Sequence, residues 1–512
     1  MPTQAIPLGS TPYASPWTSV GRERCENLYL ERAGSQTAKA QEFYIRIPGL
    51  RRKIEATNAA ACRGMFTASN GRVFASFGQG VFEILANWTM THLFNLATFT
   101  GPVRFCENGQ YLLVVDGADG WTLQFSTGTI ETIDPDSDGN EGFPRGATHC
   151  ICLDTYFLVN DPGTNRYNWS NPGYSLMTSA GISGSGGHWN GLNVAFKIAR
   201  PDNIVAIVDC QNMAWLFGAS SIEVHYDSGD YDTGVWKRYE SAIIEIGCVV
   251  DKSGKASHPA KYANNVFWIG SDKSGTVGVF MNEGFTPRRI SVRGIEQAMA
   301  QMSEIGDAIG FTFAENGHAF YLLHFPAGDR TFVYDIVTGT WHERTYLFRE
   351  MGTTHRWRGM YPTQAFGSLI FGDNSANSVH ASDQFYYQND DPQGSGVNYI
   401  RSVKTTPIGF QSGRFVRYLS IQPIFAQGQG LPVDTPQGVG VDPTAEIAYS
   451  DDAGESWTQE RSVHIGKRGL YSHRSRLTTL GSSRNRVWRI SCTSPVRFLL
   501  IGLVANIQGV DR

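Results

Sequence analysis

Residues 319–344 read AFYLLHFPAGDRTFVYDIVTGTWHER, and this stretch decides the fold class. Its first seven residues have the aromatic and apolar content of a half-buried strand, which the turn formers at 326–329 then interrupt. A second strand is predicted over residues 332–335. The chain turns at 338–340, because Gly339 can take a positive φ without a Cβ penalty. We predict a β-meander here that makes up about half of a propeller blade.

The same unit recurs along the chain. Residues 109–129 carry Tyr-Leu-Leu from Tyr111 and Thr-Gly-Thr from Thr127, an offset of 16 residues against 17 in the first stretch. Hairpins of the same kind, each around a Gly or Asp turn, are predicted at residues 73–85, 155–169, 214–226, 266–281 and 369–382. The seven hairpins start roughly 40 to 60 residues apart, as propeller blades do. We therefore predict an all-β chain with a propeller of six or seven blades; the alternative is one large irregular β-sandwich.

Length and charge suggest a second domain. A chain of 512 residues is too long for one ordinary core. Its 56 glycines, 12% aromatic and 18% charged residues are typical of a turn-rich β protein, and the net charge of −4 argues against a dedicated non-specific nucleic-acid binder. The charge is uneven: residues 401–512 hold 14 Lys and Arg against 8 Asp and Glu, about +6, which leaves the first 400 residues near −10.

The β pattern changes to turn formers around residues 388–396, and strands resume at 415–421, 445–449, 486–490 and 496–501. We divide the chain into an N-terminal segment, 1–60, that contributes to propeller closure, a propeller over 61–390, and a C-terminal β-sandwich over 400–512. The one helix predicted, over residues 295–304, places Ile295, Met299 and Met302 on one face, which we expect to pack on a blade.

The cysteines and termini exclude several classes of protein. Eight cysteines are scattered without a Cys-x-x-Cys pair, so we expect buried thiols, no metal site and no cofactor. The first residues lack the regions of a signal peptide, and no apolar run approaches 18 residues. We expect neither secretion nor a membrane anchor, and synthesis in the cytoplasm.

One motif predicts a structural turn. Residues 450–457 fit the Asp-box pattern Ser-x-Asp-x-Gly-x-Ser/Thr-Trp through Ser450, Asp452, Gly454 and Trp457. In such a turn the Asp carboxylate accepts backbone N–H bonds, the Gly takes a left-handed conformation and the Trp covers the turn. We expect these four residues to pin a hairpin of the sandwich.

Several short segments resemble one family. Arg24-Cys25-x-Asn27-Leu28-Tyr29, followed about twenty residues later by Pro48-Gly49-Leu50, resembles the opening of the tail-hub proteins of short-tailed bacteriophages, also called packaged-DNA stabilisation proteins. Further matches, in the family's order, lie at residues 220–223, 294–299, 324–326, 333–335, 341 and 493–496.

The resemblance implies a virion tail protein. It implies a homohexameric ring, the hub or nozzle below the portal and head-to-tail adaptor proteins, that carries tailspikes or tail fibres. The ring would retain packaged double-stranded DNA in its channel without sequence preference and guide its ejection. No catalytic residue follows from this reading.

A glycan-binding or glycan-hydrolysing propeller is the alternative. Asp boxes occur in sialidase propellers, and Arg46-Ile47-Pro48 is similar to the motif that carries one substrate arginine there. The box occurs once, in the C-terminal part, and neither two further substrate arginines nor a Tyr/Glu nucleophile pair can be assigned. The same residues 46–50 also fit the hub family's Pro-Gly-Leu.

Overall fold

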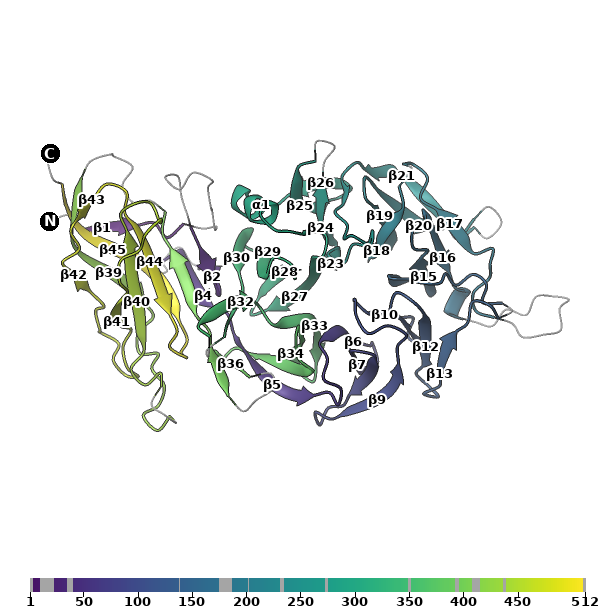
Figure 1. The fold of residues 1–512 in the computed structure, drawn as a ribbon, viewed down its shortest axis with the longest axis horizontal. Helices are drawn as coiled ribbons and strands as arrows, with labels where there is room; N and C mark the ends of the chain where they lie inside the picture. Colours follow the sequence, from purple (N-terminus) through teal and green to yellow (C-terminus); the bar gives the residue numbers. More distant parts are fainter. Residues whose placement is uncertain are drawn as a thin grey trace.

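The computed structural model describes residues 3–9, 23–34, 40–137, 139–174, 187–200, 202–230, 234–271, 275–348, 351–391, 396–407, 415–435 and 439–509. Figure 1 shows a ring of small sheets around a common centre and, at the left, a second body that contains β1 and β45. The chain is therefore an all-β protein in which a β-propeller is joined side by side to a β-sandwich.

The first four blades each have four antiparallel strands in sequence order, and the predicted hairpins form their middle pairs. The strands are β6 (Cys62–Thr67), β7 (Val73–Phe77), β8 (Gly80–Ile84) and β9 (Met90–Asn95); β10 (Arg104–Glu107), β11 (Tyr111–Val115), β12 (Gly120–Gln124) and β13 (Ile130–Ile133); β14 (Cys150–Leu153), β15 (Tyr156–Asn160), β16 (Arg166–Trp169) and β17 (Val194–Phe196); and β18 (Ile204–Cys210), β19 (Met213–Gly218), β20 (Ile222–Asp227) and β21 (Trp236–Ile244).

The last three blades are less regular. In the fifth, two short strands share the inner position beside β24, and in the seventh the outer strand, β5, comes from the N-terminal segment and pairs with β35. Their strands are β22 (Gly247–Cys248), β23 (Ala260–Tyr262), β24 (Asn265–Ser271), β25 (Val277–Glu283) and β26 (Thr286–Arg289); β27 (Ile309–Glu315), β28 (His318–Phe325), β29 (Arg330–Asp335) and β30 (Thr340–Glu343); and β33 (Gly359–Ala365), β34 (Ser368–Asp373), β35 (Ser378–Asp383) and β5 (Gly49–Glu55). The described residues form seven blades, which decides between six and seven.

The stretch that predicted the fold supplies three of the four strands of blade 6, not half of a blade. The predicted helix forms as α1 (Arg293–Ala300). It begins two residues before the predicted range of 295–304 and ends four residues before the end of that range, with Gln301 as its C-cap. Ile295 and Met299 are buried beside Trp341 in the cluster between blades 5 and 6, as expected for a helix packed on a blade.

Apolar clusters fill the spaces between neighbouring blades. Blades 1 and 2, for example, share Phe74, Val81, Leu112 and Val114, and all eight residues of β28 are buried. Strands covered on both faces favour continuous apolar runs over alternation. Each large apolar side chain buried in this way contributes roughly 1.5–3 kcal/mol.

The sandwich is built from both ends of the chain. One sheet has the order β3 (Leu28–Arg32), β4 (Glu42–Arg46), β45 (Leu499–Gly509), β39 (Val416–Phe425) and β42 (Leu477–Thr478), with β1 (Thr3–Ile6) on β45 and β43 (Ser482–Ser483) on β39. The facing strands are β38 (Ser402–Thr405), β44 (Val487–Cys492), β40 (Thr444–Ser450) and β41 (Arg461–His464). The N-terminal segment thus supplies strands to both domains, and the division at residues 60, 390 and 400 stays a prediction.

One sheet passes through both domains. The short strand β2 (Cys25–Glu26) runs parallel to β30 of blade 6 and antiparallel to β38 of the sandwich. A nine-stranded sheet therefore runs β27-β28-β29-β30-β2-β38-β44-β40-β41 from the propeller into the sandwich, as Figure 1 shows at the centre left.

Two hairpins lie outside the blades: β31 (Thr345–Phe348) with β32 (Thr353–Arg356), and β36 (Gln388–Asp390) with β37 (Val397–Tyr399). Among the described residues, no helix has the length and apolar character that a membrane crossing requires.

Candidate functional site at the junction of the two domains

Asn27 turns the chain at the junction. It follows β2 and has φ 52°, a left-handed conformation that Asn adopts more readily than most residues because its short side chain bonds locally. Its backbone N–H donates to the carbonyl of Glu343 at 2.8 Å, and its own carbonyl accepts from Ile47 at 3.2 Å. The chain can therefore leave the nine-stranded sheet at β2 and enter the opposite sheet of the sandwich at β3.

The Asn27 side chain joins three segments. Its amide nitrogen donates to Thr345 Oγ1 and to the Arg401 carbonyl, both at 2.8 Å, and its amide oxygen accepts from the Thr345 backbone N–H at 2.8 Å. Thr345 begins β31 after blade 6, and Arg401 precedes β38 of the sandwich. One buried amide thus connects the N-terminal segment, the propeller and the sandwich, and both of its donor hydrogens are used.

Arg46, the residue of the sialidase-like motif, is also committed to the junction. Only 1% of it is exposed. Its Nε donates to Ser402 Oγ at 2.8 Å, and its terminal nitrogens donate to the carbonyls of Ser494, Val496 and Cys492. The guanidinium therefore ties β4 to the facing sheet of the sandwich, through β38 and the end of β44, and its donors are used there and not on a ligand carboxylate.

A buried histidine connects β3 of the sandwich to blade 6. His318 Nδ1 lies 2.7 Å from Asp335 Oδ2, and its Nε2 lies 3.0 Å from Glu31 Oε2. Burial alone would lower the pKa of His318, but the hydrogen bonds to Asp335 and Glu31 outweigh it and raise the pKa. The imidazolium form is therefore favoured where β3 meets the propeller.

Two clefts flank the junction. One, of about 430 Å³, lies between α1, the edge of blade 6 and residues 23–25, and the other, of about 440 Å³, is lined by Glu31, Asn316, Phe385 and Arg497 among others. In the first cleft the Arg330 guanidinium forms a bidentate pair with Glu343 at 2.8 and 2.9 Å. Both residues belong to blade 6, in β29 and β30, so this pair neutralises the two charges within the propeller wall of the cleft.

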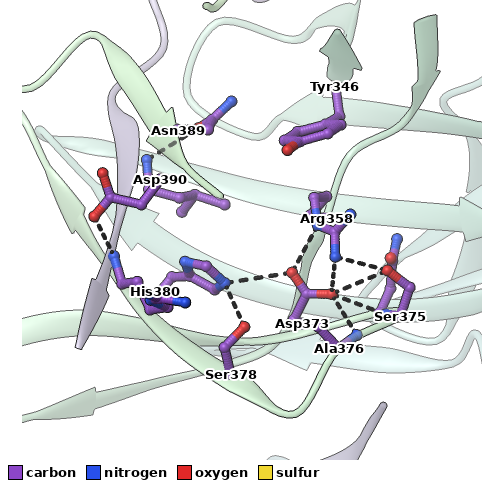
Figure 2. Close-up of polar contacts among 12 residues, drawn as sticks. Tyr346, Arg358, Asp373, Ser375, Ala376, Ser378, His380, Asn389 and Asp390 are labelled. Atoms are coloured by element: carbon purple, nitrogen blue, oxygen red, sulfur yellow. Dashed lines mark hydrogen bonds and ion pairs between the residues drawn. The ribbon is translucent and has the colours of Figure 1, made fainter. Parts of the chain in front are cut away.

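Polar side chains also pin the closing strand β5, as Figure 2 shows. Asn389 Oδ1 accepts from the Leu50 backbone N–H at 3.0 Å, and Asp390 Oδ2 accepts from that of Arg52 at 2.8 Å. Side chains of β36 thereby accept hydrogen bonds from backbone N–H groups on the free edge of β5. Strand β5 is therefore held along both edges, by β35 on one side and by the side chains of β36 on the other.

A buried aspartate organises the same blade. Asp373 ends β34 and accepts from both arms of Arg358 at 2.7 Å, with His380 Nε2 at 3.3 Å on its other side (Figure 2). Burial alone would raise the pKa of Asp373, but the bonds from His380 and Arg358 lower it to about 2. Its Oδ1 also accepts from the backbone N–H groups of Ser375 and Ala376, so this carboxylate caps the turn into β35.

The Asp-box residues lie in the turn between β40 and β41. Asp452 accepts from the Ser456 backbone N–H at 2.9 and 3.0 Å, Ser450 Oγ accepts from the Gly454 N–H at 2.7 Å, and Gly454 has φ 99°. The half-buried Trp457 ring lies 4.5 Å from the guanidinium carbon of Arg489. Their role as a stabilising turn stays a prediction.

The described residues contain no group of three or more His, Cys, Asp or Glu side chains placed to hold a metal ion. All eight cysteines have free thiols, and seven of them are buried.

The fold and this joint define a propeller that shares one continuous sheet with a sandwich. A family model described as bacteriophage P22 Gp10, β-propeller, matches residues 26–384, and one described as bacteriophage P22 Gp10, β-sandwich, matches residues 421–508. The first match alone covers more than half of the chain, so the chain belongs to the bacteriophage P22 Gp10 family of phage stabilisation proteins. It has a structural role in a phage tail and is a component of the virion.

No curated protein sequence matches the chain. Similar solved structures include the Neurospora crassa Pan2 WD40 domain, with 7% identity, a TM-score of 0.39 and coverage of 64% of this chain and 90% of that one. The N-terminal domain of Nup159 is similar at 8% identity with a TM-score of 0.38, over 68% of this chain and 97% of that one.

Sequence reasoning did not identify Asn27 or His318 as junction residues. Asn27 lies in the motif that carried the family resemblance. The one local signal of a buried junction residue was that this polar side chain stands among the apolar residues Cys25, Leu28 and Tyr29. For His318 no local signal exists, because its two carboxylate partners lie 287 and 17 residues away.

Proposed function

We propose that this chain is the hub, or nozzle, of a short phage tail. Six copies form a ring below the portal and the head-to-tail adaptor proteins. The ring retains the packaged double-stranded DNA without sequence preference, guides its ejection, and carries tailspikes or tail fibres. The match of both domains to the P22 Gp10 family carries this proposal.

The joint between the domains supports it. A cyclic ring needs two different faces on each subunit, held at a constant angle so that the last copy meets the first. The nine-stranded sheet and the buried Asn27 amide connect the domains without a free linker at β2, so each copy can present both faces at one angle. Rigid subunits suit a ring that withstands the pressure of packaged DNA.

The test is the number of copies in the particle. Cryo-electron microscopy of intact tails, with mass spectrometry of the particle proteins, should find six copies per tail next to the portal–adaptor assembly. The purified protein alone is a weaker test, because a ring completed on a template can have weak contacts between free copies. Any other copy number would contradict the assignment.

We also propose that the chain is not a hydrolase. The Arg46 guanidinium, which a sialidase-like site would require, is buried and donates to three carbonyls of the sandwich. Incubation with a fluorogenic sialoside should give no turnover above background. Cleavage that disappears in a folded Arg46→Lys variant would favour the glycosidase alternative instead.

A further inference from the structure

The last strands of the sandwich carry one sign of charge. From Arg461 to Val510 the sequence contains nine Lys and Arg and no Asp or Glu. A run of 50 residues with nine basic residues and no acidic one is far from the composition of the chain as a whole, which has 43 basic and 47 acidic residues. The basic excess of the C-terminal part is therefore concentrated in one short region of the fold.

This region forms one edge of the sandwich, where its two sheets meet. Ser475 Oγ donates to the His464 carbonyl at 2.6 Å, and Arg461 Nη1 donates to the Thr478 carbonyl at 3.0 Å, so residues 475–478 run beside β41. On the other side β42 and β43 pair with β39. In Figure 1 these strands lie at the left end of the molecule, away from the propeller.

Four arginines project from this edge, and we name them the basic edge: Arg417, Arg474, Arg476 and Arg484. All four are exposed, and each stands next to a buried residue, which turns the guanidinium groups outward. None of the four forms an ion pair with any residue that the structure describes. Three nearby cations are neutralised, by contrast, through the pairs Arg486–Asp451, Arg489–Glu460 and Lys467–Asp442.

Like charges gathered on one edge repel each other unless an external anion compensates them. Guanidinium groups bind phosphate in a bidentate way, and hydroxyl groups commonly add phosphate contacts. The exposed Thr478 and Ser482 lie between these arginines on β42 and β43. The chemistry of the edge therefore fits a row of closely spaced phosphates, such as a DNA duplex, which carries one charge per ~1.7 Å of its axis.

We propose that the basic edge binds the phosphate backbone of double-stranded DNA, so that the sandwich is the part of the subunit that faces the packaged genome. This rests on the proposed function, which supplies the duplex. Contacts to phosphate alone carry no sequence information, so binding is non-specific and strongly dependent on salt.

The experiment measures binding of a fluorescein-labelled 20-base-pair duplex of mixed sequence to the full-length protein by anisotropy, from 50 to 250 mM NaCl. Each phosphate contact contributes about −0.9 to the slope of log K against log salt. Arg474→Gln/Arg476→Gln should lower the steepness of that slope by about 2. The matched control is Arg288→Gln/Arg293→Gln, which removes the same charge from exposed propeller positions and should leave the slope unchanged.

Three outcomes would overturn the proposal: wild-type protein that does not bind the duplex at 50 mM NaCl, an equal loss of slope in both double variants, or an Arg474/Arg476 variant that changes the association of copies but not the slope. The last would mean that the edge joins subunits. The proposed function is tested separately, because the copy number in particles does not depend on binding by the isolated protein.

Discussion

The propeller and the sandwich are both β domains and share one sheet, but they bury different ionisable groups. The propeller buries four neutral histidines, His149, His258, His324 and His342, whereas the sandwich has only His464 and His473, neither of them fully buried. The sandwich instead gathers positive charge, while the first 400 residues are acidic. We therefore expect acid to destabilise the propeller, and added salt to weaken the electrostatic contacts that the sandwich makes with its partners.

The largest expected effect is acid destabilisation of the propeller. Burial lowers the pKa of His149, His324 and His342 to about 3 and that of His258 to about 4. Because these pKa values lie below the ~6.5 of an unfolded histidine, the stabilisation is complete above pH 6.5 and is lost as the pH falls toward 4. Each histidine then costs about 1.4 kcal/mol per pH unit.

Hydrogen exchange at pH 7, 6 and 5, corrected for intrinsic rates, should show blades losing protection before the sandwich strands do. His342 provides the control, since neither of its ring nitrogens has a hydrogen-bond partner among the described residues. His342→Leu should reduce the pH dependence of the unfolding free energy by about 1.4 kcal/mol per pH unit without removing a bond. An unchanged dependence would mean that burial of histidine is not the cause.

The second effect concerns the joint that makes the two domains one body. Asn27→Ala leaves the buried partners in Thr345 and Arg401 without the amide, which should cost roughly 3 kcal/mol, and Ala in a left-handed conformation adds about 1 kcal/mol. Calorimetry should then resolve two transitions that lie further apart than any in the wild-type protein. Asn27→Gly, which accepts the backbone but lacks the amide, should be about 1 kcal/mol less destabilised than Asn27→Ala. A single, unshifted transition in both variants would show that Asn27 does not stabilise the joint.

A third, smaller effect has the opposite sign to the first. The pKa of His318 is raised, so the stability from its bonds to Glu31 and Asp335 is present below pH 6.5 and lost as the pH rises through the folded-state pKa. Denaturation from pH 6 to 9 should show a slight decline that His318→Gln abolishes. If the variant declines as steeply as wild type, another group is responsible.

The propeller was predictable because its signal is local and repeated. The hairpin pairs around turns such as those at Thr127 and Thr338 lie within a few residues of each other, and seven copies reinforce one another. The joint was not predictable, because β2 pairs with strands more than 300 residues away and carries two residues only. Likewise, the role of β5 in blade 7 depends on a partner at the far end of the propeller sequence, which no periodicity reveals.

The candidate site shows the same limit. A motif identifies residues such as Asn27 and Arg46 without saying what they contact, and Arg46 suggested a substrate arginine for that reason. The deciding facts are that its guanidinium is buried and that its acceptors are the carbonyls at 492, 494 and 496. Those acceptors lie about 450 residues away, so only the folded chain brings them together.

The smallest effect is expected at the Asp-box turn, and it tests whether the sandwich can be weakened without the propeller. Trp457 is only half-buried and stacks on Arg489, so Trp457→Ala should cost about 1 kcal/mol and lower protection in β40 and β41 alone. The bonds from Ser450 and Ser456 hold the pKa of Asp452 well below its usual range, so this turn stays intact through the pH range in which the propeller weakens. Asp452→Ala should therefore lower the hydrogen-exchange protection of β40 by the same factor at pH 7 and at pH 5. A variant with wild-type protection that instead loses binding to a glycan array would show that the box is a ligand site and not a stabilising turn.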